Sequence, residues 1–142
     1  MNDETRTAAP LDLAGELIAT DFQGWPAELH DEFQRNAFND QVGSELLADD
    51  GRVRVWMITV PPGGRLPVHR HVLDYFWTAL ADGRSIQHTD DGTTRRVSYR
   101  TGQTHHLNFG PGQYLLHDLQ NDGPTELKFL TVEHHRRRDE GR

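Results

Sequence analysis

Apolar and polar residues alternate in short runs along most of the chain after residue 43. The clearest run is RVRVWMITV at residues 52–60, where arginine and valine alternate before an apolar stretch. Successive side chains of a strand point to opposite faces of a sheet, so this pattern predicts strands with one buried face. The other predicted strands cover residues 44–48, 75–80, 85–88, 95–99, 114–120 and 126–134, with a further strand and a loop within residues 101–113.

Turn residues separate these runs. Asp-Gly and Pro-Gly pairs recur at intervals of about ten residues, which is the spacing expected when short strands are joined by hairpins. This pattern predicts an all-β sandwich or barrel. Before it, Leu29, Phe33 and Ala37 follow one another at a spacing of four. Pro26 suits a first helical turn, so we expect a short amphipathic helix over residues 26–38, preceded by a loose arm of about twenty residues.

The composition of the chain argues against several classes of protein. A chain of 142 residues is of single-domain size, and its net charge of −7 argues against nucleic acid as a partner. No apolar run approaches the ~20 residues of a membrane-spanning helix, and the acidic N-terminus lacks the pattern of a secretory signal, so we expect a cytoplasmic protein. Cysteine is absent, so a metal site would have to use histidine, carboxylate or amide ligands.

The stretch VHRHVLDYFWTALADG, residues 68–83, contains the main candidate chemistry. His69 and His71 lie two residues apart, and in a strand both would point to the same face. Pointing inward, two neutral imidazoles would need polar partners in a mostly apolar interior. His117, on a neighbouring strand, could join them, and three imidazoles with open positions opposite are an arrangement that catalytic first-row metals use.

These residues resemble the two motifs of the cupin superfamily. The first motif, G-x5-H-x-H-x(3,4)-E-x6-G, is matched by Gly63, His69, His71 and Gly83, although its glutamate is missing. The second motif, G-x5-P-x-G-x2-H-x3-N, begins at Gly102 and ends at His117 and Asn121, with a middle that is about four residues longer. The chain is also similar to a group of small single-domain cupins with an HRHxxDYFWTA motif, most of which have no assigned reaction.

The resemblance implies a fold and a division of the chain. The fold is a double-stranded β-helix, or jelly-roll barrel, with a short N-terminal helix and arm. We expect an arm with the helix in residues 1–41, the cupin barrel in residues 42–133, and a polar tail in residues 134–142. The resemblance also implies a homodimer, since small cupins often pair through their N-terminal strands.

The position of the motif's glutamate falls at Tyr75 or Phe76, and neither can supply a carboxylate. Asp74 is the nearest acid. The fourth metal ligand is therefore left open among Asp74, His106, Gln113 and water. Of the adjacent residues His105 and His106 only one can face inward, and we favour His106 because it shares a strand face with Thr104 and Asn108. Asp74, Tyr75 and His106 are the candidates for catalytic residues.

We therefore predict one divalent metal ion bound by His69, His71 and His117, with iron first and zinc, manganese or nickel as alternatives. The predicted function is a metal-dependent enzyme, with an oxygenase first, acting on a small organic molecule chelated at the three histidines. The alternatives are a metal-dependent isomerase or lyase, a non-catalytic small-molecule-binding protein, and a metal-free protein whose histidines are hydrogen-bonded core residues or acid–base groups. Many reactions occur on this fold, so fold alone does not choose among them. Since a histidine must be neutral to bind a metal, we expect metal affinity to fall below about pH 6.5.

Overall fold

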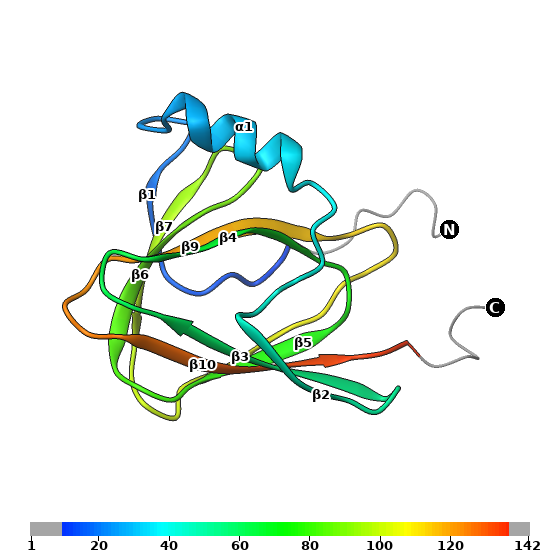
Figure 1. Ribbon diagram of the computed structural model, residues 1–142. Helices are drawn as coiled ribbons and strands as arrows, with labels where there is room; N and C mark the ends of the chain where they lie inside the picture. Colours follow the sequence, from blue (N-terminus) through cyan, green and yellow to red (C-terminus); the bar gives the residue numbers. More distant parts are fainter. Residues whose placement is uncertain (1–9, 137–142) are drawn as a thin grey trace.

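Two five-stranded antiparallel sheets face each other in the computed structural model of the chain, which describes residues 10–136 (Figure 1). Sheet A contains, in spatial order, β1 (Glu16–Ala19), β7 (Thr94–Tyr99), β6 (Gly83–His88), β9 (Leu115–Asn121) and β4 (Arg65–His71). Sheet B contains β2 (Glu45–Asp49), β3 (Val53–Val60), β10 (Leu127–His134), β5 (Tyr75–Ala79) and β8 (Thr104–Leu107). The helix α1 (Ala27–Arg35) lies across the outer side of sheet A. The predicted all-β class with one short helix is confirmed.

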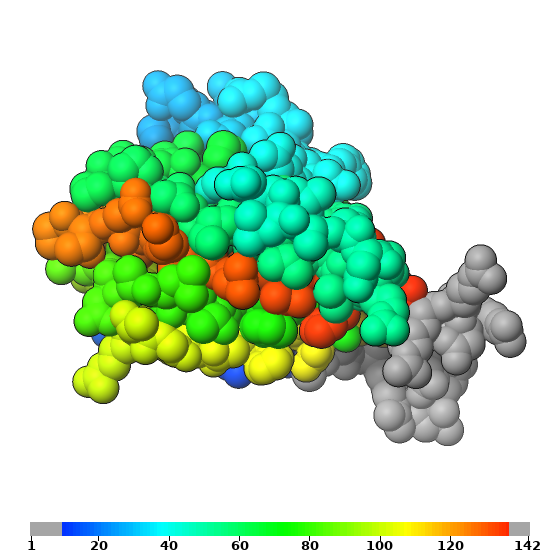
Figure 2. All heavy atoms as spheres, turned by 60° about the horizontal axis from the view of Figure 1, so that its bottom comes forward, coloured from blue at the N-terminus to red at the C-terminus, as the bar shows by residue number. Residues whose placement is uncertain are grey.

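The predicted jelly-roll arrangement of two facing sheets is confirmed, but the term barrel does not apply to it. Within residues 10–136, sheet A ends at β1 and β4 and sheet B at β2 and β8, and the two sheets do not close on each other. Figure 2 shows the outer side of sheet B, where β10 in red runs between β3 in teal and β5 in green. Alternation along a strand specifies one buried face, which a sandwich and a barrel both satisfy, so the pattern could not decide between them.

The predicted N-terminal arm is partly built into the sheets. Residues 16–19 form β1, which pairs with β7, although no alternation of apolar and polar residues predicts a strand there. Residues 27–35 form α1, close to the predicted helix. Residues 1–9 of the arm and 137–142 of the tail lie outside the described residues. Among the described residues, no helix has the length and apolar character needed to cross a membrane.

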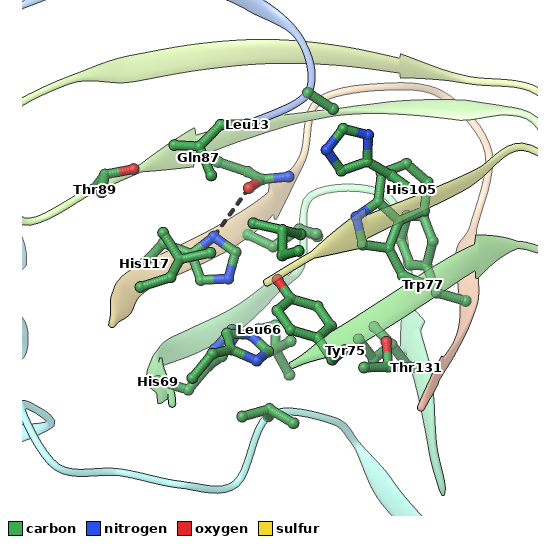
Figure 3. Close-up of a pocket in the computed structure, with 18 of the residues that line it drawn as sticks. Leu13, Leu66, His69, Tyr75, Trp77, Gln87, Thr89, His105, His117 and Thr131 are labelled. Carbon is green, nitrogen blue, oxygen red and sulfur yellow. Dashed lines mark hydrogen bonds between the residues drawn. The ribbon is translucent and has the colours of Figure 1, made fainter. Parts of the chain in front are cut away.

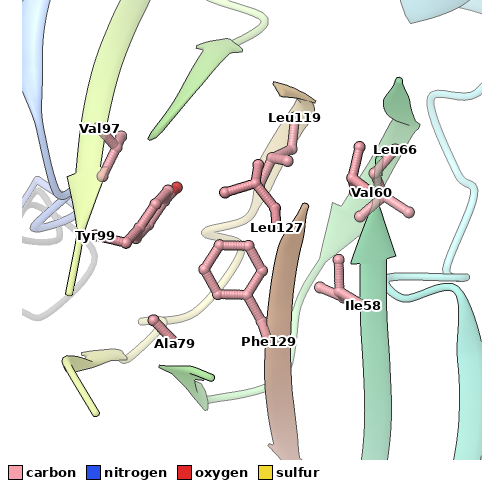
Figure 4. Close-up of a cluster of buried hydrophobic side chains, with 9 residues drawn as sticks. All are labelled: Ile58, Val60, Leu66, Ala79, Val97, Tyr99, Leu119, Leu127 and Phe129. Atoms are coloured by element: carbon pink, nitrogen blue, oxygen red, sulfur yellow. The ribbon is translucent and has the colours of Figure 1, made fainter. Parts of the chain in front are cut away.

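The apolar core lies between the sheets (Figure 4). Its residues come from six strands on both sides: Ile58, Val60, Leu66, Ala79, Val97, Tyr99, Leu119, Leu127 and Phe129. Each large side chain buried in this way stabilises the fold by roughly 1.5–3 kcal/mol relative to exposure. This core forms part of the wall of the pocket described below.

The second apolar cluster fixes the helix to sheet A. Leu29 and Phe33, one helical turn apart, pack on Val68 of β4 and Leu116 of β9. An ionic contact adds to this packing, since Arg65 on β4 binds both Glu32 of the helix, at 3.0 Å, and Asp118 of β9, at 2.8 Å. Both faces of sheet A are therefore covered at β4 and β9, the strands that carry the three histidines.

We expect Asp118→Ala to destabilise the protein by about 3 kcal/mol, because its fully buried carboxylate accepts hydrogen bonds from Arg65 and from the backbone N–H of His88, at 2.7 Å. Burial opposes its ionisation, yet the bonds from His88 and Arg65 outweigh this and lower its pKa. Urea unfolding would measure the loss. The control is Asp122→Ala, whose more exposed carboxylate makes looser contacts with Arg84 and Arg96. Equal losses in the two variants would contradict this account.

Candidate metal site

Three histidine rings meet in the interior, on the inner side of sheet A. His69 and His71 lie on β4, and His117 lies directly opposite His69 on β9. The ring centroids are 4.6 Å apart for His69 and His117, 4.9 Å for His69 and His71, and 5.3 Å for His71 and His117. One ring nitrogen of each lies within 4.8 Å of the others, so the three could hold a metal ion. All three side chains are buried.

A bulge in β4 makes this arrangement compatible with the core. The pairing register shifts between Leu66 and His69, so both side chains point inward although the two residues are three positions apart, an odd spacing. Val68, inside the bulge, points outward beneath α1. Its N–H donates to Glu32, and its carbonyl accepts from Asn36 and Asn39, so side chains in and after the helix satisfy its backbone groups.

Hydrogen bonds set the tautomers of two of the rings. His69 Nδ1 donates to the carbonyl of Pro67 at 2.7 Å, and His117 Nδ1 donates to Gln87 Oε1 at 3.0 Å. Gln87 Nε2 donates in turn to the Tyr99 hydroxyl at 3.0 Å, which fixes the orientation of the Gln87 amide. In both histidines the proton sits on Nδ1, so the Nε2 lone pair is free to bind a ligand.

Two of the ring nitrogens are buried without any hydrogen-bond partner within residues 10–136. They are His71 Nδ1 and His117 Nε2. A buried polar atom without a partner is uncommon and requires an explanation, and a bound ion is one such explanation. Both atoms belong to the three-histidine group, so this donor set fits a metal ion.

Burial keeps these imidazoles uncharged. It lowers the pKa of His69 to about 4, although the hydrogen bond to Pro67 and the charge of Asp118 act in the opposite direction. Burial, followed by the neighbouring histidines, lowers the pKa of His71 well below its usual value, and burial and His69 do the same for His117. Near neutral pH all three are therefore in the form that binds metals.

Tyr75 covers one side of the group. Its ring stacks on His71 with centroids 4.0 Å apart and an interplanar angle of 7°. Burial, together with the charge of Glu133, raises the pKa of its phenol far above the ordinary value, so the hydroxyl keeps its proton. Figure 3 shows this hydroxyl directed into the pocket. Tyr75 lies at one of the two positions where the sequence motif would have a glutamate, so a neutral donor takes the place of a carboxylate.

The pocket beside the histidines has a volume of about 50 Å³. A cavity of this size holds roughly four water molecules, which corresponds to a ligand of a few non-hydrogen atoms. Core residues such as Leu66 and Phe129 make much of its wall apolar. The other polar groups that line it are Gln87, Thr89, Arg95, Tyr99, His105 and Thr131.

The other predicted site residues lie outside this pocket. Asp74 is exposed between β4 and β5, where Oδ1 accepts the N–H of Phe109 at 2.7 Å. Gln113 is half-buried in the loop before β9, where Oε1 accepts the N–H of Gly110 at 2.9 Å. Neither residue is among those that line the pocket, so in this arrangement neither carbonyl or carboxylate oxygen faces the histidines.

The expectation that His106 faces inward is wrong. On β8 it is His105 that lines the pocket, stacked on Trp77 at 5.7 Å, while His106 is exposed and lies against Phe76 at 5.2 Å. Leu107, two residues after His105, is buried, so these two residues share the inner face of β8. The face shared by Thr104, His106 and Asn108 is the outer one.

Sequence reasoning missed Gln87 and Arg95 in this pocket and misassigned His105. Gln87 shares a strand face with the buried Ser85, and Arg95 shares one with the buried Val97 and Tyr99. This parity was a signal that both would point inward. Their closeness to the histidines depends on β6 lying between β7 and β9, which no local pattern reveals.

Comparison with known proteins gives matches among solved structures. No family model matches the chain, and no curated protein matches it. A cupin domain from Bordetella pertussis is 24% identical with a TM-score of 0.58, covering 70% of this chain and 97% of that chain. An RmlC-like cupin family protein with a double-stranded β-helix fold, from Methanocaldococcus jannaschii, is 20% identical with a TM-score of 0.52, covering 64% and 77%. At these identities the likeness concerns the fold alone.

Proposed function

Because this chain has the cupin fold and buries three histidines with unpartnered ring nitrogens, we propose that it binds one divalent metal ion and is a metal-dependent enzyme. His69, His71 and His117 would hold the ion, and the substrate would be a small organic molecule. The observation that carries the proposal is the pair of buried nitrogens without a partner in residues 10–136, His71 Nδ1 and His117 Nε2, on two of three grouped imidazoles. A chain that used these histidines only for packing would be expected to hydrogen-bond them.

Three neutral imidazoles suit several first-row metals. Iron is our first choice. Zinc, manganese and nickel are alternatives, because affinity order alone does not select the metal in a nitrogen site. Three protein ligands leave positions for a substrate or water. When bound, the ion would supply Lewis-acid or O2-activating chemistry.

The surrounding residues would orient the ligands and the substrate. Pro67 and Gln87 hold the Nδ1 protons of His69 and His117, so that each Nε2 lone pair is directed away from these partners. Tyr75 would donate a hydrogen bond from its neutral phenol to substrate in the pocket. The apolar wall, including Leu66 and Phe129, would exclude water and strengthen these polar contacts.

An oxygenase is the first of the proposed reaction types. An isomerase or lyase using the same metal differs in having no need of O2, so turnover under anaerobic conditions separates the two. A non-catalytic binding protein would hold the metal and ligand without turnover. Activity that survives complete removal of the metal would favour acid–base chemistry by the histidines themselves.

Elemental analysis tests the proposal directly. We expect untagged protein, purified without added metal, to contain close to one divalent metal ion per chain. The metal found would then order the reactions, since iron favours O2 chemistry and zinc favours an isomerase or lyase. Protein that contains no metal and takes up none on reconstitution would contradict the proposal.

We expect Gln87→Leu to lower metal affinity by about 10–100-fold, because His117 would lose the acceptor that fixes its tautomer. A competition titration with a chromogenic chelator would measure the change. Gln23→Leu is the control, since Gln23 is exposed before α1. Unchanged affinity in the Gln87 variant would mean that this hydrogen bond does not prepare His117 for a metal.

A homodimer and a cytoplasmic location stay predictions. Within the described residues, β1 and α1 of the predicted arm pack on sheet A of the same chain. The edge strand β2, with Leu46 and Leu47 about half exposed, is a more accessible surface for a second copy. Light scattering of the parent protein would measure its oligomeric state.

A further inference from the structure

Arg95 contributes a cationic side chain to the lining of the pocket. It lies on β7 with the same parity as the buried residues Val97 and Tyr99, so its side chain projects to the inner side of sheet A. The side chain lines the pocket, and its Nε is buried without a hydrogen-bond partner within residues 10–136. A guanidinium cannot lose its charge in a protein, so this donor needs an acceptor from elsewhere.

The described residues that line the pocket carry a positive charge. Among the residues between 10 and 136 that line it, Arg95 is the one with a permanent charge, and none of them is an aspartate, glutamate or lysine. The remaining polar groups are neutral amides, hydroxyls and imidazoles. Such a lining favours an anion, and bidentate binding by a guanidinium favours a planar carboxylate in particular.

Strand pairing brings this cation close to the histidines. Arg95 lies opposite Gln87 in the register of β7 and β6, and Gln87 bonds to His117 at 3.0 Å. Residues opposite each other in an antiparallel pair have Cβ atoms about 5 Å apart. Arg95, Gln87, His117 and His69 thus lie on the four neighbouring strands β7, β6, β9 and β4 of sheet A.

We propose that Arg95 binds the carboxylate of the substrate, which is therefore a small carboxylic acid anion. The rest of that acid would lie against the apolar wall and extend towards the three histidines. The reaction that this acid would undergo rests on the metal-dependent function proposed above. Because the cavity of about 50 Å³ is small, we expect a short acid with roughly five non-hydrogen atoms, such as propionate or lactate.

Calorimetric titration with propionate, lactate, their uncharged amides and inorganic phosphate would test this. We expect the parent to bind both acids and to bind the amides at least about tenfold more weakly. Arg95→Gln should lose at least tenfold for each acid, and Arg95→Lys should recover part of the preference for the acids over the amides. The control is Arg96→Gln, on the same strand but exposed on the outer side, which should bind as the parent does.

Several results would overturn the inference. These are acid binding by Arg95→Gln that equals the parent, equal binding of acids and amides, binding of phosphate as tight as that of the acids, or no saturable binding of either acid. The same titrations on His117→Ala separate this inference from the proposed function. If the acid preference is lost there but kept in Arg95→Gln, the metal binds the acid and only the role of Arg95 fails. If the parent contains no metal but still binds acids through Arg95, the inference stands and the proposed function fails.

Discussion

The His117→Ala protein should purify with little or no metal, while the His106→Ala protein should contain as much as the parent. His117 would supply one of three ligands, and its Nε2 is buried with no other partner within residues 10–136. Two histidines from one strand leave the ion without its third protein contact. We therefore expect a loss of metal affinity larger than the 10–100-fold typical of residues that only orient a ligand.

Elemental analysis of the purified variants and a chelator competition after reconstitution would measure this loss. His106 is a matched control because it is an exposed histidine on β8, and His105→Ala is a second control that removes an imidazole from the pocket lining. Near-UV circular dichroism would show that the variants are folded. If His117→Ala retains the metal of the parent, or if His105→Ala loses it equally, the ion is held elsewhere in the pocket.

The histidine group arises from strand pairing combined with one bulge. His69 and His117 lie far apart in the sequence, and the antiparallel pairing of β4 with β9 places them opposite each other. The bulge at Pro67 and Val68 then lets Leu66 join the core while both histidines of β4 point inward. Helix α1 stabilises the bulge from outside through Glu32. A change in the helix could therefore alter the geometry of the three imidazoles without touching them.

The fold class and the shared strand face of His69 and His71 could be predicted from the sequence because both depend on short-range patterns. Alternation fixes strand faces, and turn residues fix where strands end. The spacing of the two histidines on β4 places both on one face by the same rule. The third histidine, His117, was predicted from a second motif farther along the chain, and the structure brings its ring close to the other two.

The remaining features depend on which strands are neighbours. Gln87 and Arg95 meet the histidines only because β6 lies between β7 and β9. The choice between His105 and His106 required the parity of Leu107, since both faces of β8 carry a polar pattern. β1 forms because the edge of β7 offers it backbone partners, and its own four residues carry no strand pattern. Closure into a barrel depends on edge geometry, which local patterns do not encode.

Without metal, the protein should lose several kcal/mol of stability between pH 6.5 and pH 5. In the unfolded chain each imidazole takes up a proton near pH 6.5, whereas burial lowers the folded-state pKa of His69 to about 4 and those of His71 and His117 well below their usual value. The unfolded state therefore binds up to three more protons. The stability is present above about pH 6.5 and is lost as the pH falls towards the folded-state values. The slope is about 1.4 kcal/mol per pH unit for each histidine, or about 4 kcal/mol for three.

Urea unfolding followed by tryptophan fluorescence, in chelator at pH 7, 6 and 5, would measure this slope. His71→Gln removes one of the three buried imidazoles, so we expect its slope to fall by about a third, whatever its stability at pH 7. His106→Gln, on the exposed face of β8, should keep the slope of the parent. Parallel slopes for the parent and His71→Gln would mean that the buried histidines are not kept neutral by the fold. The same burial implies that metal uptake continues below pH 6.5, lower than the sequence alone predicts, because the folded histidines have no proton to release there.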